Sequence, residues 1–332
     1  MKKKLLLILI VCLLFVTGCF GKKEDVFKNI KDKYGSLKAY SLTGDLEIVN
    51  NEDTYKYDVK VIYQKKDKYY VSLKNRDNNH EQIILKNEDG VYVLTPSLNK
   101  SFKFQSDWPN NNSQIYLIGS LLKDINSDNE KDVVKGDNGY IITTKVNYPN
   151  NRSLVKQEIK LDKDYNLVSV NILNDNDTSM MKITFQTIDL KPDIDTNTFD
   201  LNKIMEDNTI PIEETKKTST IDNLIYPLYI PTGTVLTNSE TIAKSDGERV
   251  IMTFDGEKPF LLVEETSNVE DEFSIIPTYG EPYLLIDTVA SISDTSITWS
   301  SNGIDYYLVS DVLSRNELID IAKSVSTIPV IK

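Results

Sequence analysis

The sequence contains little cysteine and almost no histidine. Its two cysteines, Cys12 and Cys19, lie within the first 19 of 332 residues, and His80 is the single histidine. Beyond Cys19 no thiol remains, which excludes disulfides, cysteine nucleophiles and thiolate metal sites from the rest of the chain. Because His80 is the single histidine, catalysis that depends on several imidazoles is also excluded.

His80 is the only residue that could anchor metal or triad chemistry. His80-Glu81 begins like the zinc-protease pattern HExxH, but position 84 is isoleucine, so the second imidazole is missing. A Ser/His/Asp triad would need the same His80, and no G-x-S-x-G sequence is present. The carboxylates show no specific glycosidase pairing, and no glycine-rich phosphate loop occurs. We therefore predict an ordinary surface histidine, no catalytic residue, no metal, no cofactor and no enzymatic activity.

Acidic residues outnumber basic residues in this sequence. The chain has 38 Lys and Arg against 50 Asp and Glu, a net charge of −12. Nucleic acid is therefore not an expected partner, because phosphate binding needs clustered positive charge.

The composition is typical of globular proteins, because hydrophobic residues make up 40% of the chain, with 13 Gly and 11 Pro. The length suggests two domains of roughly 150 residues each.

The amino terminus has the pattern of an export signal. Three lysines, 2–4, precede an apolar stretch of 11 residues, 5–15, which is shorter than the roughly 20 residues of a membrane-spanning helix. The next residues, Val16-Thr17-Gly18-Cys19, resemble the lipobox of bacterial lipoproteins. We predict a signal peptide over 1–18 and lipidation of Cys19, which would anchor the chain to the outer face of the cell membrane.

Hydrophobic periodicity predicts one helix followed by many strands. Val26, Phe27, Ile30 and Tyr34 share one face of a helix over 24–34, which ends before Gly35. From residue 39 onward the period changes to two, which indicates half-buried antiparallel strands. The predicted strands are 39–49, 55–63, 69–74, 82–86, 91–95, 101–105, 140–146, 155–161, 167–173 and 180–188.

A second helix interrupts this series. Trp108-Pro109 and the asparagines after it cannot form a strand interior, and Asn112 or Ser113 can cap a helix that extends to about Asn126. A long antiparallel meander can curl around one or two apolar helices, so that the apolar face of the sheet and the helices bury each other. We predict an α+β fold, mainly antiparallel β, in which an incomplete, half-open barrel over 19–202 is covered by helices.

A polar stretch separates a second predicted domain. Residues 203–222 are rich in charged residues, Ser and Thr, and read as a linker. Beyond it, 223–332 is predicted as a small α+β domain. Its closing helix begins at Ser314, which forms an S-x-x-E capping box with Glu317. The predicted strands are 249–254, 259–264, 283–291, 296–300 and 304–309.

Residues 91–111 carry a resemblance to a known family. They read VYVLTPSLNKSFKFQSDWPNN, which is similar to the central motif of the YdcC-type sporulation lipoproteins of endospore-forming Gram-positive bacteria. That family belongs to the LolA/LolB-like lipoprotein-carrier superfamily. The resemblance covers about 24–201 and implies a half-open barrel whose apolar cavity is closed by helices. The carriers of Gram-negative bacteria hold lipoprotein acyl chains in that cavity.

The carboxy-terminal residues show a second resemblance. Trp299, Gly303, Tyr306 and the run 314–325 resemble a small uncharacterised domain of extracytoplasmic Gram-positive proteins. No chemistry is implied by this second resemblance.

Seven apolar residues are the candidates for a ligand cavity and its lid. Two interpretations remain open for them, a cavity wall or a filled core, because an aromatic stripe at such spacing forms core more often than site. The tyrosines that alternate along several strands could also form a protein-docking face. The seven candidates are Phe102, Phe104, Trp108, Ile115, Leu117, Ile118 and Leu121.

Two functions follow as expectations. The first is a membrane-anchored, extracytoplasmic carrier for an apolar ligand, such as a lipid or an acyl chain, with a role in sporulation or germination. The second is a non-enzymatic scaffold that docks a cell-wall or envelope enzyme and has a solid core.

Overall fold

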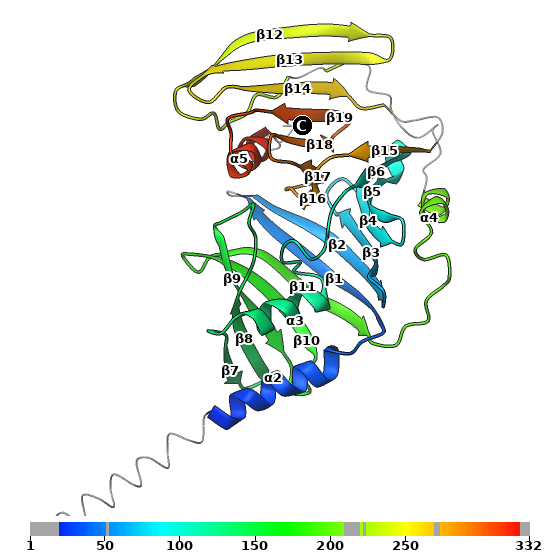
Figure 1. Ribbon diagram of the computed structural model, residues 1–332, viewed down its shortest axis with the longest axis vertical. Coiled ribbons are helices and arrows are strands. Elements are labelled where there is room, and N and C mark those ends of the chain that lie inside the picture. Colours follow the sequence, from blue (N-terminus) through cyan, green and yellow to red (C-terminus); the bar gives the residue numbers. More distant parts are fainter. Residues whose placement is uncertain (1–19, 51–52, 209–219, 222–223, 269–272, 326–332) are drawn as a thin grey trace, which may run out of the picture.

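The computed structural model of the protein describes residues 20–50, 53–208, 220–221, 224–268 and 273–325. The predicted signal peptide and Cys19 lie outside this range. The described residues form two β-sheets, mostly antiparallel, and four α-helices (Figure 1). No helix among these residues is both long enough and apolar enough to span a bilayer.

The larger sheet has twelve strands and stays open, with β15 and β7 at its edges. Its strand order is β15-β6-β5-β4-β3-β2-β1-β11-β10-β9-β8-β7. The strands are β1 (Ala39–Asn50), β2 (Asp53–Gln64), β3 (Lys68–Asn75), β4 (Glu81–Asn87), β5 (Gly90–Thr95), β6 (Lys100–Phe104), β7 (Asp132–Gly136), β8 (Gly139–Lys145), β9 (Leu154–Leu161), β10 (Leu167–Asn174), β11 (Ser179–Asp189) and β15 (Ser274–Thr278).

Alternation explains which face of this sheet is buried. In β2, Tyr57, Val59 and Val61 are buried, whereas the charged residues between them are exposed. Strands β4 and β5 depart from alternation because both of their faces are covered. Their second face packs against α4 (Leu201–Asn208), which contributes Ile204 and Met205.

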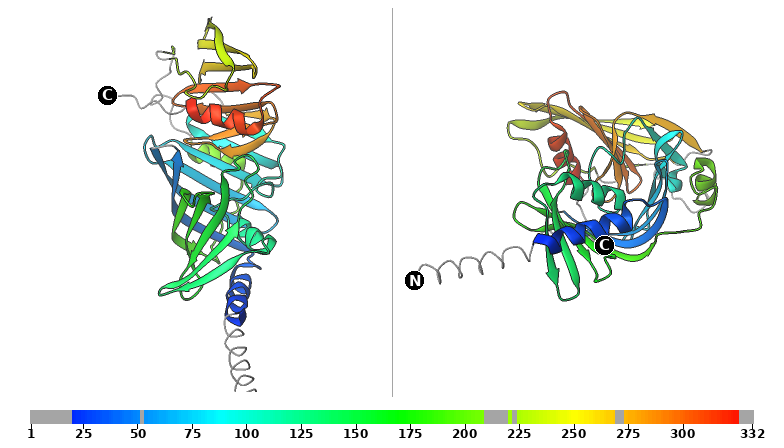
Figure 2. Two further views of the ribbon diagram at one scale, coloured as in Figure 1. Left: turned by 90° about the vertical axis from the view of Figure 1, so that its left-hand side faces the viewer. Right: turned by 60° about the horizontal axis from the view of Figure 1, so that its bottom comes forward.

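Two helices lie side by side over the main core face (Figure 2). Helix α2 (Phe20–Tyr34) buries Val26, Ile30 and Tyr34, which recur every four residues. Helix α3 (Ile118–Ser127) buries Ile118, Leu121 and Ile125. Together with the inward side chains of the sheet, these residues form the main hydrophobic core.

Helix α3 begins four residues later than a cap at Ser113 predicts. Ser113 instead bonds to Asn147: its backbone N–H donates to the Asn147 carbonyl oxygen at 2.8 Å, and its hydroxyl accepts from the Asn147 N–H at 2.8 Å. The helix N-cap is Leu117, which has no side-chain cap. A contact with a distant residue therefore replaced the expected local cap.

The smaller sheet has seven strands, in the order β12-β13-β14-β19-β18-β17-β16. Helix α5 (Arg315–Val325) packs on it, and the capping box is present: the Glu317 carboxylate accepts from the Ser314 N–H at 3.0 Å. The strands are β12 (Thr234–Lys244), β13 (Gly247–Gly256), β14 (Phe260–Thr266), β16 (Glu281–Leu284), β17 (Val289–Ile292), β18 (Ser296–Ser301) and β19 (Ile304–Val309).

The structure adds details that periodicity did not predict. Strands β7, β12 and β15 were not expected, and the single predicted strand over 283–291 is the hairpin β16–β17. The predicted linker begins inside α4, and most of its remainder lies outside the described residues. Strand β15 pairs in parallel with β6, so a carboxy-terminal segment completes the larger sheet.

Buried polar contacts join the two sheets. The Tyr57 hydroxyl donates to the Ile286 carbonyl oxygen at 2.6 Å. The Gln82 side-chain oxygen accepts from the Thr288 hydroxyl at 3.0 Å and from the Val289 N–H. These groups are buried, so each would be costly to leave unpaired.

Candidate functional site

An aromatic ladder runs across three neighbouring strands. Tyr40 on β1 lies directly opposite Tyr63 on β2, and Tyr63 lies opposite Tyr69 on β3. Residues opposite one another on a sheet face have adjacent Cβ atoms, and the ring centroids are 5.1 Å and 5.0 Å apart. Tyr69 and Trp108 form a T-shaped pair whose ring centroids are 5.6 Å apart. Strand register therefore brings the three tyrosine rings together, and the chain after β6 adds Trp108 to them.

The ladder forms one wall of a hollow between α2 and α3. This tyrosine hollow has a volume of about 360 Å³, which is within the range of about 300–1,000 Å³ usual for ligand pockets. Lys31 and Lys123 are exposed at its rim, and Lys123 donates to the Asn110 carbonyl oxygen at 2.6 Å. Its lining is Lys31, Tyr34, Gly35, Leu37, Tyr40, Tyr63, Tyr69, Ile118, Gly119, Leu122, Lys123 and Asn126.

Burial sets the electrostatics of this hollow. It raises the pKa of Tyr40 well above its ordinary value and also raises the pKa values of Tyr63 and Tyr69. The phenols therefore stay neutral over the physiological range. A wall of neutral hydroxyls and aromatic faces suits an amphiphilic or apolar ligand, and the lysines at the rim carry the positive charge.

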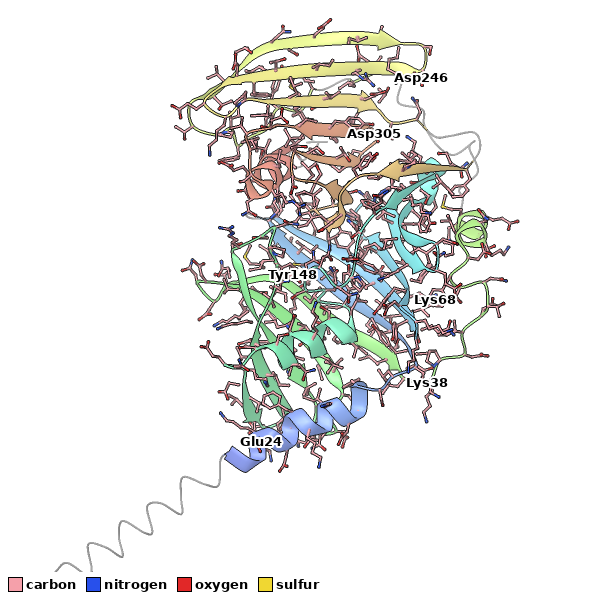
Figure 3. The ribbon with its side chains drawn as sticks, viewed as in Figure 1. Glu24, Lys38, Lys68, Tyr148, Asp246 and Asp305 are labelled. Atoms are coloured by element: carbon pink, nitrogen blue, oxygen red, sulfur yellow. The ribbon has the colours of Figure 1, made fainter. Side chains whose placement is uncertain are left out.

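A second, smaller cavity lies where the two sheets meet. The junction cavity has a volume of about 110 Å³. Trp108 and Ile115 border it from the larger sheet's side, Leu285 borders it from the segment after β16, and Lys323 of α5 also lines it. Burial lowers the pKa of Lys323. Tyr148, another lining residue, lies midway along the molecule (Figure 3).

The seven predicted cavity residues divide between core and cavity. Trp108 and Ile115 border the junction cavity, and Ile118 borders the tyrosine hollow. Phe102, Phe104 and Leu117 line neither of these two spaces. Phe102 is half-buried, and the other six are buried in the main core.

Ile118 and Leu121 meet at a void of only about 10 Å³. A space of that size is close to the minimum for one water molecule. The site of Leu121 is therefore packed core.

Sequence reasoning missed the tyrosines that form the ladder. The alternating tyrosines were assigned only as a group, to an alternative protein-docking face, and Tyr40, Tyr63 and Tyr69 were not among the cavity candidates. The sequence contained a usable signal for two of them. Tyr63 and Tyr69 flank the polar run 64–68, and a hairpin turn in this run places the two tyrosines opposite one another. Locating Tyr40 beside them required the pairing of β1 with β2.

His80 differs from the expected surface histidine. It is half-buried beside the start of β4, and burial lowers the pKa of its imidazole. The adjacent Glu81 accepts from the Ser72 hydroxyl at 2.5 Å. Within the described ranges, no group of three or more His, Cys, Asp or Glu side chains is placed to hold a metal.

Comparisons with known sequences found one family. The model of the family described as "Sporulation protein YdcC-like" matches residues 2–199. The curated "Sporulation protein YdcC" of Bacillus subtilis (strain 168) is 35% identical over 322 residues, which cover 96% of this chain and 95% of that protein.

Solved structures show weaker likenesses. MucB has 13% identity and a TM-score of 0.35, covering 93% of this chain and 97% of that one. The complex of the CwlD amidase of Clostridioides difficile with the GerS lipoprotein has 18% identity and a TM-score of 0.23, covering 49% and 93%. The LolA superfamily protein NE2245 of Nitrosomonas europaea has 9% identity and a TM-score of 0.31, covering 55% and 98%. These scores are too low to support an argument about function.

Proposed function

Because the chain belongs to the YdcC-like family of sporulation proteins, we propose that it is a lipid-anchored binding protein of spore-forming cells. It acts on the outer face of the cell membrane and holds an apolar chain, such as a lipid acyl chain, in the tyrosine hollow. It carries out no chemistry on this ligand.

The observation that carries this proposal is the tyrosine hollow itself. Its volume of about 360 Å³ can take a substantial part of an acyl chain, whereas the junction cavity of about 110 Å³ can take only a few carbon atoms. Two larger hollows, of about 500 Å³ and 620 Å³, are lined mostly by polar residues and suit an acyl chain less well. Burying apolar ligand surface there contributes roughly 25 cal/mol per Å². Lys31 and Lys123 at the rim suit an anionic head group.

The proposed mechanism treats the larger sheet as a half-open barrel. The sheet supplies the aromatic wall through β1, β2 and β3, and α2 and α3 act as the lid. Lipidation of Cys19 would place this opening within the length of α2 from the membrane, because α2 begins at Phe20, directly after Cys19.

A filled hollow should abolish ligand uptake. The test uses a lipid-free chain, residues 19–332 with Cys19→Ala, and cis-parinaric acid as a fluorescent acyl probe. Leu122→Trp places a large ring in the hollow, and we expect it to weaken probe binding at least tenfold. Leu190→Trp is the matched control, because Leu190 is also half-buried against the main core but does not line the hollow.

The scaffold is the alternative function. It is favoured by the packing around Leu121, which leaves almost no space under α3. If the parent chain binds no acyl probe, or if both tryptophan variants bind it as well as the parent does, the carrier proposal is wrong. A scaffold that docks an envelope protein is then the better account.

A further inference from the structure

Strand β12 is an unusually exposed edge of the smaller sheet. Nine of its eleven residues are exposed, from Val235 to Ala243, and Val235 has 63% of its surface accessible. Within the described residues, β13 is its only pairing partner. Long, uncovered edges of this kind readily pair with another chain, and natural proteins usually protect them.

The β12–β13 hairpin shows which backbone groups are free. Lys244 lies opposite Gly247 across a two-residue turn, so this pair closes the hairpin with hydrogen bonds. In an antiparallel ladder bonded and non-bonded pairs alternate. Counting back from Lys244, Ser239, Thr241 and Ala243 direct their N–H and C=O groups away from β13.

A bulge near the start of β12 limits the regular, unpaired edge to the rest of the strand. The register shifts between Leu236 and Asn238, which indicates a bulge at that end. Residues 238–244 are regular and contain no proline. The lysine that could guard this edge, Lys244, forms an ion pair with Glu265.

The position of β12 argues against a membrane as its occupant. Helix α2, which follows the predicted anchor, lies at one end of the molecule, and β12 lies at the other (Figure 1). Asp246, at the β12–β13 turn, and Glu24, in α2, mark these two ends (Figure 3). A chain anchored at its amino terminus therefore presents β12 far from its attachment point.

The net charge of residues 224–325 indicates which kind of protein segment fits the edge of β12. Residues 224–325 contain 17 Asp and Glu but only 5 Lys and Arg, a net charge of −12. A second copy would bring the same charge, and like charges at close range are unfavourable. A basic segment is complementary to this region. Glu240 is exposed in the middle of the free edge and can pair with a basic residue on an added strand.

We propose that residues 238–244 of β12 form a docking edge for an extended segment of a partner protein in which basic and apolar residues alternate. The segment adds to the sheet as an eighth strand next to β12. The main-chain groups of Ser239, Thr241 and Ala243 bind its backbone. Its basic side chains lie on the face of Glu240, and its apolar side chains lie on the opposite face, next to Thr241 and the buried Val250 of β13. This docking edge is separate from the tyrosine hollow, so its test does not depend on whether the hollow binds an acyl chain.

Peptide binding tests the docking edge. The lipid-free chain is titrated with three labelled, end-blocked peptides: KVKVKVK, its proline-interrupted form KVKPKVK and the acidic form EVEVEVE. We expect KVKVKVK to bind at least tenfold more tightly than either of the others. On binding, the amides of Ser239, Thr241 and Ala243 should gain protection from hydrogen exchange.

Two substitutions at one position separate backbone pairing from side-chain effects. Thr241→Pro removes an outward N–H without removing a hydrogen bond to β13, and proline is tolerated at such edge positions. We expect Thr241→Pro to weaken KVKVKVK binding about tenfold, whereas Thr241→Val changes it less than twofold. The peptide KVKPKVK tests the same pairing on the parent chain even if Thr241→Pro folds poorly.

Several results would overturn the docking edge. Absent binding of KVKVKVK, equal binding of EVEVEVE, or protection confined to other amides would each do so. A parent chain that sediments as a dimer, and becomes a monomer with Thr241→Pro, would show that the edge serves a second copy instead.

Discussion

Residues 20–208 contain 30 acidic and 27 basic side chains, whereas residues 224–325 contain 17 and 5. The nearly neutral region contains the tyrosine hollow between helices that cover its sheet face. The strongly acidic region exposes an edge strand and several apolar side chains. The two proposals use these regions separately, with ligand binding in the first region and partner docking in the second.

The two regions are nevertheless joined more tightly than a polar linker suggests. Strand β15 belongs to the larger sheet although it lies in the carboxy-terminal part of the chain. Lys100 and Asp305 form a largely buried ion pair at 3.5 Å between the two sheets. Trp108 and Trp299 are the only tryptophans, one in each region, so single-tryptophan variants can report the unfolding of each region separately.

The largest expected effect distinguishes packed core from hollow within the first region. Leu121→Ala should lower the free energy of unfolding by about 3 kcal/mol, because Leu121 is almost fully buried in the main core. The neighbouring Leu122 borders the same small void but is only half-buried and also lines the tyrosine hollow, so Leu122→Ala should cost under about 1.5 kcal/mol. Urea denaturation followed by Trp108 fluorescence measures both. Equal costs would mean that the two positions do not differ in packing.

An intermediate effect tests the coupling of the two regions. Gln82→Ala leaves the Thr288 hydroxyl and the Val289 N–H without their acceptor, at a cost of about 2 kcal/mol. The unfolding curves reported by Trp108 and Trp299 should then separate. Gln157→Ala is the control, because Gln157 is equally buried but bonds to Asp124 within the larger sheet's core. Curves that separate already in the parent chain would contradict the coupling.

The smallest effect contrasts one buried acid in each region. Burial raises the pKa of Glu264 from 4.5 to about 7, so the folded state holds a proton that the unfolded state releases. Stability of the smaller sheet should therefore fall by about 1.5 kcal/mol as the pH rises from about 5.5 to 7. Trp299 fluorescence during urea denaturation measures this fall, and Glu264→Gln should abolish it.

Asp124 is the counterpart in the first region, where burial raises its pKa to about 6. In the Gln82→Ala background, where the two regions should unfold separately, Asp124→Asn should leave the Trp299 pH dependence unchanged. If Glu264→Gln keeps the full pH dependence, another group is responsible.

Local patterns determined much of this fold from the sequence. Alternation between apolar and polar residues predicted most strands of both sheets, because half-buried strands need one apolar face. The capping box at Ser314 was confirmed, since its partners lie only three residues apart. The family was also recognised from residues 91–111. The predictions for Cys19 and for the domain boundaries remain predictions.

Only the tertiary structure decided the features that depend on distant partners. Strand β15 was not predicted because its hydrogen bonds are made with β6, far away in the sequence. Ser113 lost its expected capping role to Asn147 for the same reason. The tyrosine hollow required the register of β1, β2 and β3 together with the placement of two helices. A single sequence fixes the periodicity of each segment, but register and packing depend on which segments meet.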